Sequence, residues 1–331
     1  MAIIFSIQYK KIGLFILTGL FVLICRPLLS QVSPLYSMNY EYGQFINPAI
    51  TGAQKTPIID ISRQQYWIGN PQSPNTTCAA FSARLGAFNF YDPRMLLNRS
   101  NIFSSGRMGV GGLIMQSNDG PLSSYCMVAS YAYYLPLNMS GRELSLGLSS
   151  QFLNYSVNNS LLSPMDQGDP ELKQPGHSKI LPEPGCGIYY HDEQLFIGAG
   201  VDNFFKSYTD YNSSKPKYRD FNFQSGYRFF LKYCDLEPSV FITKTDIMPA
   251  LYYAQLKLYW NLNWFTIGYN SSQAMLASLG VTVQRFYISY IFQQNFNQLG
   301  NYFGSSNELM IGINIGHFEP NRIIKRSIDK F

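Results

Sequence analysis

Apolar side chains recur at every second position along many short stretches of this chain. In residues 143–149, Leu144, Leu146 and Leu148 alternate with polar or small residues, and residues 252–260 and 309–316 repeat the pattern. Neighbouring side chains of a β-strand point to opposite faces, so a period of two predicts strands with one apolar face. This periodicity restricts the chain to folds built from sheets.

Further stretches show the same alternation less regularly. They are residues 57–68, 76–87, 106–117, 123–136, 185–191, 194–205, 219–233, 236–245, 262–270, 274–284 and 284–294. With the three above, they predict about 14 strands of about 9 to 14 residues, the length of a tilted strand that crosses a bilayer. Residues around 233–235 and 261–263 are short enough for hairpins. The polar segments 156–184 and 206–218 are predicted to be outer loops.

The N-terminus resembles an export signal. Lys10 and Lys11 precede an apolar run over residues 12–25, and no acidic residue occurs before Glu41. A positive start followed by a short apolar run is typical of a secretory signal peptide, here residues 1–30 with cleavage near Ser30. The run is shorter than the ~20 residues that span a membrane. A retained helical anchor, or lipidation of Cys25, are the alternatives.

The mature chain has no second apolar stretch long enough for a membrane helix. Aromatic residues make up 16% of the sequence and charged residues only 14%. In lipid every backbone N–H and C=O must pair within the protein, and a closed barrel achieves this for a sheet. We therefore predict an all-β fold, a transmembrane antiparallel β-barrel of about 14 strands over residues 56–317, in the bacterial outer membrane, with a C-terminal tail over residues 318–331. A soluble β-sandwich or lipocalin-like barrel is the alternative.

Charged residues within the predicted strands are costly on the lipid side. We expect them to face the interior or to lie near an interface; they are Arg63, Arg84, Arg228, Lys257 and Arg285. Removal of Lys10, Lys11 and Arg26 with the signal peptide lowers the formal net charge from +5 to +2. This balance does not favour a nucleic-acid partner.

Catalytic and metal-binding patterns are absent from the sequence. The three histidines, His177, His191 and His317, lie far apart, and no nucleophile elbow or phosphate-binding loop occurs. The acidic residues 166–171 lack the ligand spacing of a calcium loop. The remaining cysteines, Cys78, Cys126, Cys186 and Cys234, form no CxxC pair, and the sequence leaves open whether they form disulfides. We predict no enzymatic activity, no catalytic residue, no cofactor and no metal.

The start of the mature region carries a more specific pattern. It reads SPLYSMNYEYGQFINPAITGA, followed after a short strand by RQQYW. This resembles the PorP/SprF family of membrane proteins of the type IX secretion system at Ser37, Tyr40, Asn47, Pro48, Ala49, Gly52, Arg63 and Trp67. One extra residue separates Arg63 from Trp67 compared with the family pattern.

The resemblance extends over nearly the whole mature chain in consistent order. Shorter matching stretches are Asp119–Pro121, Leu144–Leu148, Gly187–Tyr190, Leu236–Ser239 and Ser306–Leu309. In the last of these, Asn307 stands where the family usually has histidine. The resemblance implies a non-enzymatic barrel of the type IX secretion or gliding apparatus that supports export or surface attachment of specific cargo. Its partners would be other outer-membrane and periplasmic components of that system, a secreted or adhesin cargo protein, and membrane lipid.

Residues 31–55 are predicted to form an extended segment before the first strand. A proline disfavours helix at the residue before it, here Asn47, and Gly52 permits a turn. The segment would plug the lumen, lie along the periplasmic rim, or only cap the first strand. The family-motif residues Asn47, Pro48, Ala49, Gly52, Arg63 and Trp67 are therefore candidates for a structural or partner-binding role. The alternative function is a porin or a FadL-like carrier for hydrophobic solutes.

Overall fold

The computed structural model describes residues 43–54, 56–68, 73–85, 106–137, 142–157, 181–204, 219–246, 249–296 and 304–315. The predicted signal peptide, His177, His317, the acidic residues 166–171 and the tail over 318–331 lie outside these residues. No helix within the described ranges is long and apolar enough to span a membrane.

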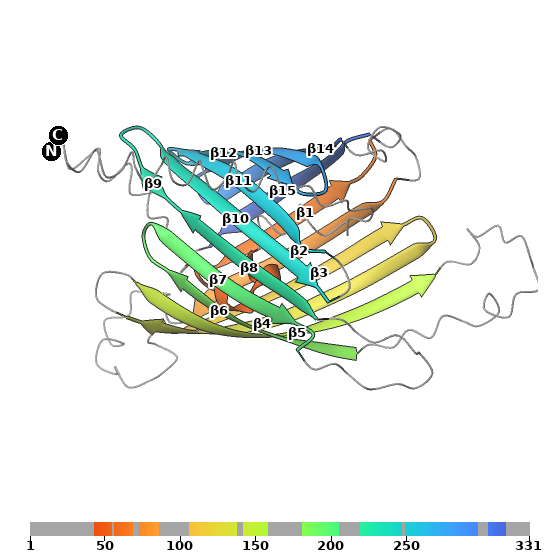
Figure 1. Ribbon diagram of the computed structural model, residues 1–331, viewed down its shortest axis with the longest axis horizontal. Coiled ribbons are helices and arrows are strands. Elements are labelled where there is room, and N and C mark those ends of the chain that lie inside the picture. Colours follow the sequence, from red (N-terminus) through yellow and green to blue (C-terminus); the bar gives the residue numbers. More distant parts are fainter. Residues whose placement is uncertain are drawn as a thin grey trace, which may run out of the picture.

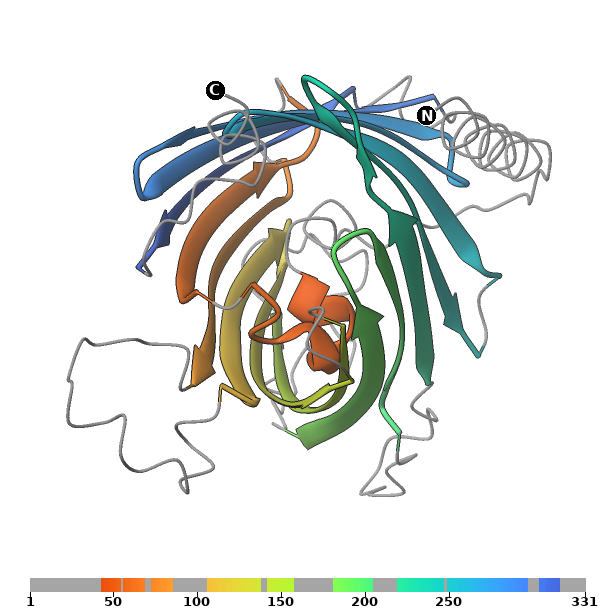
Figure 2. The ribbon, with the colours of Figure 1, turned by 90° about the vertical axis from the view of Figure 1, so that its left-hand side faces the viewer.

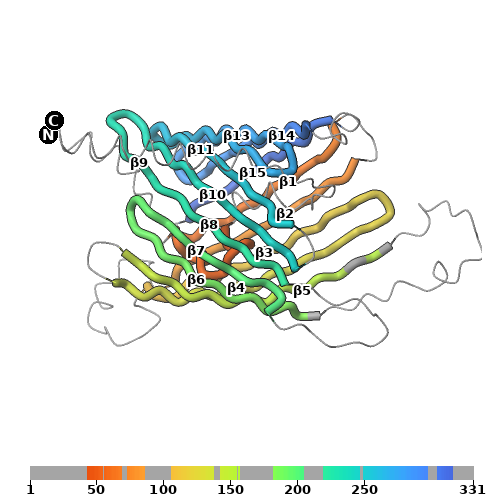
Figure 3. Tube along the Cα trace, viewed as in Figure 1, coloured from red at the N-terminus to blue at the C-terminus, as the bar shows by residue number. Residues whose placement is uncertain are grey.

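Antiparallel strands form one closed sheet (Figure 1). The strands are β1 Ile58–Gln65, β2 Asn75–Leu85, β3 Met108–Asp119, β4 Leu122–Pro136, β5 Glu143–Val157, β6 Leu181–His191, β7 Leu195–Asp202, β8 Asp220–Tyr227, β9 Phe229–Phe230, β10 Asp235–Thr245, β11 Leu251–Trp260, β12 Asn263–Asn270, β13 Ala274–Val283, β14 Phe286–Asn295 and β15 Ser306–Asn314. Apart from β8 and β9, which both pair with β10, each strand pairs with its neighbours in the sequence, and β1 pairs with β15 to close the ring. The chain therefore winds once around the barrel, as the colours along the trace show in Figure 3.

The strand β9 continues β8 after a break at Arg228, and both pair with β10. Counted as one, they give the closed 14-strand antiparallel barrel that the sequence predicts. The prediction of one continuous strand over residues 219–233 is therefore wrong. Sequence periodicity also ends the fifth strand too early and begins the sixth too late, because Ser149, Ser150 and Gln151 interrupt the alternation and β6 contains Pro182 and Pro184. Pairing with neighbouring strands extends both elements through these positions.

Alternation of inward and outward side chains follows the prediction. On β5, Leu146 and Leu148 are exposed on the outer surface, whereas Ser145 is buried inside. On β15, Leu309 and Ile311 are exposed and Glu308 is buried. A soluble sandwich or barrel buries its apolar strand faces, whereas here they coat the outside and polar side chains line the inside. The apolar outer face is that of a barrel in lipid.

Charged residues of the strands occupy several environments. Arg84 lies on the inner face and is 3% exposed, and Lys257 shares the inner face of β11 with the buried Tyr253. Arg228 lies at the break between β8 and β9, and Arg285 lies in the turn before β14. Arg63 is exposed on the outer face, next to the end of β1. These places follow from the high cost of a charge at the lipid-facing midplane.

The four cysteines within the described ranges, Cys78, Cys126, Cys186 and Cys234, are free thiols. Cys78 on β2 and Cys126 on β4 are buried, and each lies opposite Met115 on the intervening β3. Together with Ala80, Leu113 and Met310 they form an apolar cluster on the inner wall. Both thiols serve as small apolar side chains in this cluster.

A segment that precedes β1 lies inside the ring of strands (Figure 2). It contains a four-residue helix, α2 Gly43–Ile46, and a 3-10 turn, η3 Pro48–Ile50. Its Phe45 packs against the apolar cluster of the inner wall, and Ile46 packs with Phe241, Leu251 and Tyr253 on β10 and β11. We call residues 43–54 the inner segment.

Candidate functional site

The inner segment derives its local shape from the motif around Asn47. Asn47 has an extended backbone, with φ −147° and ψ 110°, and its side chain accepts a hydrogen bond from the Ala49 N–H, at 3.0 Å. Pro48 occupies the first position of η3, where a missing N–H costs nothing. Gly52 has a φ of 82°, which glycine adopts without strain. The motif therefore encodes a capped turn followed by a sharp reversal.

The Asn47 side chain also binds the barrel wall. It is 1% exposed, and its Nδ2 donates to the carbonyl oxygen of Ile188 on β6, at 3.0 Å. Its Oδ1 is engaged by Ala49, so both ends of the amide have partners. An aspartate or alanine at this position would lose the bond to Ile188, because only the amide nitrogen donates.

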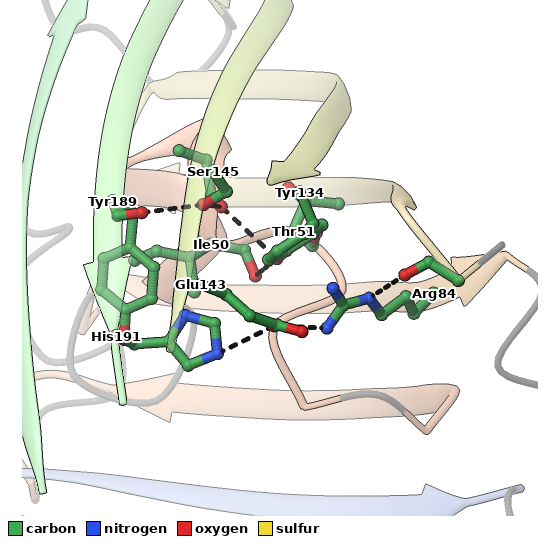
Figure 4. Close-up of polar contacts among 10 residues, drawn as sticks. Ile50, Thr51, Arg84, Tyr134, Glu143, Ser145, Tyr189 and His191 are labelled. Atoms are coloured by element: carbon green, nitrogen blue, oxygen red, sulfur yellow. Dashed lines mark hydrogen bonds and ion pairs between the residues drawn. The ribbon is translucent and has the colours of Figure 1, made fainter. Parts of the chain in front are cut away.

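Hydroxyl groups of the wall bind the backbone of the inner segment. The Tyr134 hydroxyl lies 2.8 Å from the carbonyl oxygen of Thr51, and the Ser145 hydroxyl donates to the carbonyl oxygen of Ala49 at 2.6 Å (Figure 4). Ser82 accepts from the Gly52 N–H at 2.9 Å. The η3 turn is too short to use these backbone groups itself, so the wall supplies their partners.

Further polar contacts fix both ends of the segment. The Thr51 hydroxyl donates to the Ser130 hydroxyl on β4, at 2.9 Å. At the other end, Asn222 on β8 donates to the carbonyl oxygen of Ile46, at 3.1 Å, and to Asp202 on β7, at 3.0 Å. The segment is therefore anchored to strands from β2 to β8.

Glycines of the wall make room for the backbone of the segment. A Cβ atom on Gly147 would overlap the backbone of Pro48 and Ala49, and one on Gly187 would overlap the Asn47 side chain. A Cβ on Gly109 would overlap the carbonyl of Thr51. Glycine within a strand commonly marks a close approach of another backbone. We call the surface formed by these glycines with Ser82, Ser130, Tyr134, Ser145, Ile188 and Asn222 the cradle.

A charged network holds Tyr134 in place. Arg84 and Glu143 form an ion pair at 2.8 Å, and Nε2 of His191 lies 3.3 Å from the same carboxylate (Figure 4). The Arg84 guanidinium lies 3.8 Å from the centre of the Tyr134 ring, within the range of a cation–π contact. His191, the one histidine among the described residues, is thus part of a structural network that supports the cradle.

The predicted motif residues separate into two groups. Asn47, Pro48, Ala49 and Gly52 meet at the cradle. Arg63 and Trp67 do not: Arg63 points outward from β1, and Trp67 follows the end of that strand with a φ of 53°. The inward residue next to Arg63 is Gln64, which lies directly opposite Glu308 where β1 and β15 close the ring, and both are 1% exposed.

Sequence reasoning missed the residues that receive the motif. Tyr134, Ser145 and Asn222 were not predicted as site residues, although Leu144–Leu148 and Gly187–Tyr190 matched the family pattern. The signal present in the sequence was the placement of Gly147 and Gly187 at inward-facing positions of their strands. Which segment those glycines receive follows only from the tertiary structure.

The described residues contain no group of three or more histidine, cysteine, aspartate or glutamate side chains arranged to hold a metal ion. The polar groups of the cradle are hydroxyls and amides that bind backbone. Their chemistry is that of peptide recognition.

Comparison with protein families gives one match, to the type IX secretion system membrane protein PorP/SprF, over residues 29–313. The chain belongs to this family. Its closed barrel with an apolar outer face, in a family of secretion-system membrane proteins, locates it in the outer membrane. The fold and family of this PorP/SprF protein are those of a membrane-barrel component of the secretion system.

Similar solved structures are also outer-membrane barrels. Omp33 of Acinetobacter baumannii has 7% sequence identity and a TM-score of 0.44, covering 79% of this chain and 99% of that one. The CymD monoaromatic hydrocarbon channel has 10% identity and a TM-score of 0.44, covering 84% and 93%. A mutant ferric enterobactin receptor of Pseudomonas aeruginosa has 8% identity and a TM-score of 0.34, covering 72% and 44%. No curated protein sequence matches this chain.

Proposed function

We propose that this PorP/SprF protein is a non-enzymatic barrel component of the type IX secretion and gliding apparatus that supports export or surface attachment of specific cargo proteins. The family match over residues 29–313 is the observation that carries the proposal. Its partners on this proposal are other outer-membrane and periplasmic components of the system, a secreted or adhesin cargo, and the surrounding lipid. Arg63 and Trp67, which lie away from the cradle, are candidates for contacts with these partners.

We further propose that residues 31–55 form a plug. The hydrogen bonds of Asn47, Tyr134 and Ser145 support this role, because they hold the inner segment against the inner wall of the barrel. A barrel obstructed in this way would act through protein contacts at its rims and loops. The charged network of Arg84, Glu143 and His191 supports the same view, since its groups bind one another and the Tyr134 ring.

Co-purification from detergent-solubilised outer membrane tests the secretion role. We expect an affinity-tagged barrel, expressed from its own locus, to recover secretion-system components and at least one secreted or adhesin protein. An unrelated outer-membrane barrel carrying the same tag is the control for nonspecific recovery. Isolation of the barrel alone, under conditions that keep the secretion core intact, contradicts the proposal.

Planar-bilayer recordings separate the plugged barrel from the porin and from the FadL-like carrier for hydrophobic solutes. The full chain is expected to give no steady conductance and no uptake of hydrophobic solutes. A variant with Gly147→Leu, in which the new side chain displaces the inner segment, is expected to conduct. Steady conductance of the unmodified barrel, or solute uptake by it, would favour the transport reading.

A further inference from the structure

The outward side chains of β1 to β5 change from apolar to polar in one step towards the rim that carries the β3–β4 turn. Ile61, Ile114 and Met127 belong to a row of directly paired outward residues that is apolar throughout, and each of them is more than half exposed. At the next outward position of each strand, the directly paired residues are Arg63, Thr77, Gln116, Tyr125 and Asn154. We call these residues the polar row.

The polar row is accessible from outside the barrel. Arg63 is exposed on β1, and Tyr125 on β4 is 46% exposed. Gln116 donates from its Nε2 to the Tyr125 hydroxyl at 3.1 Å, and nearer the rim Asn118 donates to Asn75 at 3.3 Å. Arg63 makes no hydrogen bond or ion pair with another described residue. Contacts along the row therefore order its amides and leave the guanidinium free for a ligand.

The polar row is confined to one sector of the barrel. On β8, β12 and β13, the outward residues nearest the same rim are Phe221, Tyr269 and Met275. Phe221 and Met275 are 43% and 45% exposed. The outer face of these strands thus stays apolar or aromatic up to its last position, whereas β1 to β5 continue past their apolar row with amides, hydroxyls and a cation.

The position of the polar row corresponds to the outer leaflet. Most of the longer connections leave from its rim, over residues 66–74, 158–180 and 203–219. The opposite rim carries, apart from the connection between β2 and β3, short turns such as residues 261–262 and 284–285. Outer-membrane barrels place their longer loops outside the cell and their short turns in the periplasm. The polar row therefore lies where the apolar face meets the headgroups of the outer leaflet.

The chemistry of the row suits a phosphorylated sugar. Lipopolysaccharide, the glycolipid of the outer leaflet, carries phosphate groups on a saccharide directly above its acyl chains. An arginine binds phosphate through charge-assisted hydrogen bonds, and amides such as those of Gln116 and Asn154 both donate to and accept from hydroxyls. The row contains no acidic side chain that would repel phosphate. Adjacent outward positions of a strand lie about 7 Å apart, so acyl chains packed on Ile61 bring the headgroup to Arg63.

We propose that the polar row binds the phosphorylated saccharide headgroup of lipopolysaccharide. Arg63 binds a phosphate, Gln116 and Asn154 bind sugar hydroxyls, and the acyl chains of the same molecule lie on the apolar row around Ile61 and Ile114. The inference goes beyond the proposed secretion role. It depends on the outer-membrane location of the barrel and on neither that role nor the plug.

Lipid binding to the refolded barrel tests the proposal. The chain without its predicted signal peptide is refolded in detergent, so that it starts free of membrane lipid, and heat-modifiable gel migration verifies that it is folded. Lipid A, the phosphorylated and acylated disaccharide of lipopolysaccharide, is then titrated, and native mass spectrometry measures the fraction of barrel that carries it. The variants are Arg63→Gln and the double variant Gln116→Leu, Asn154→Leu. Arg285→Gln, which removes an exposed arginine at the opposite rim, is the matched control.

The unmodified barrel and Arg285→Gln are expected to bind lipid A equally well. Arg63→Gln is expected to need about tenfold more lipid, because a hydrogen bond to a charged group changes affinity by about this factor. The double variant is expected to weaken binding of lipid A and to leave binding of phosphatidylglycerol, which has a phosphate but no sugar, unchanged. No loss in Arg63→Gln, or an equal loss in Arg285→Gln, overturns the inference. Binding of phosphatidylglycerol as tightly as lipid A by the unmodified barrel also overturns it.

The same variant separates this inference from the proposed function. If Arg63→Gln loses lipid A binding but still recovers secretion-system components on co-purification, the polar row binds lipid whatever the fate of the secretion role. If Arg63→Gln binds lipid A normally and loses a secretion-system component instead, the row contacts protein and its assignment to lipopolysaccharide is wrong.

Discussion

The two walls of the barrel interior carry similar polar residues but differ in what those residues bind. On the cradle, the Ser145 and Tyr134 hydroxyls and the Asn222 amide bind backbone carbonyls of the inner segment. On the wall formed by β10 to β15, the hydroxyls of Ser278 and Ser289 have no hydrogen-bond partner. The difference shows that a polar lining does not by itself specify a site. The cradle becomes one because glycines let a backbone come within reach of its hydroxyls.

The largest loss of stability is expected on removal of Arg84, a charge on the inner face, compared with removal of Arg63 on the outer face. Arg84→Met removes one member of a buried ion pair and the cation above the Tyr134 ring, so the Glu143 carboxylate loses its bond to the guanidinium. Loss of one partner of a buried pair costs about 3–5 kcal/mol. Thermal unfolding of the refolded barrel in detergent measures this loss. Arg63→Met, at an exposed outer position, is the control and should change stability by well under half as much.

Replacement of glycine by alanine is expected to lower stability on the cradle wall and to have little effect on the other wall. Gly147→Ala introduces a Cβ that overlaps Pro48 and Ala49, and overpacking of this kind typically costs about 1–3 kcal/mol. Gly268→Ala is the matched control on the other wall, since its Cβ meets neighbours at ordinary contact distances of 3.4 Å and more.

Limited chymotrypsin digestion measures the release of the inner segment, because Phe45 lies within it. Cleavage at Phe45 should accelerate in the Gly147→Ala barrel and remain slow in the Gly268→Ala barrel. Equal cleavage in the two variants would show that the close approach at Gly147 does not hold the segment.

Removal of hydroxyls should sharpen the comparison further. Ser145→Ala leaves the Ala49 carbonyl without its bond from Ser145, and loss of such a buried bond costs about 1–3 kcal/mol. Ser289→Ala removes a hydroxyl that makes no hydrogen bond to any described residue, so its effect on the free energy of unfolding should be close to zero or slightly stabilising. Urea unfolding in lipid vesicles compares the two. A larger loss at Ser289 than at Ser145 would reverse the assignment of the walls.

The smallest change in stability is expected at Asp192, in the turn after β6 and away from both walls. Partial burial opposes ionisation of Asp192, but the N–H groups of Leu195 and Gln194, each 2.7 Å from its carboxylate, lower its pKa overall. A lowered pKa in the folded state adds stability above the unfolded value, and this stability is lost as the pH falls through the folded pKa. The Asp192→Asn barrel should therefore be less stable than wild type at neutral pH. The difference in stability should shrink as the pH falls below about 4. An unchanged difference at low pH contradicts this assignment.

Much of the fold was predictable because strand periodicity is a local property. Alternation at Leu144–Leu148 and Leu309–Ile315 indicated which side chains face lipid, and the structure confirms the closed antiparallel barrel of 14 strands. The boundaries of β5 and β6 and the break at Arg228 were not predictable, because cross-strand pairing decides them. Of the candidate site, Asn47, Pro48, Ala49 and Gly52 were named from their family pattern, whereas Tyr134 and Asn222 had no local signal.

The sequence by itself determined that this chain forms outward-apolar strands and carries a capped turn around Asn47, because both depend on residues close together in the chain. Only the tertiary structure decided where that turn goes. The groups that bind it lie on β2, β4, β5, β6 and β8, and they meet only when β1 pairs with β15 and the ring closes. Contacts between residues as far apart as Ile46 and Asn222 depend on the curvature of the whole sheet, which no local pattern encodes.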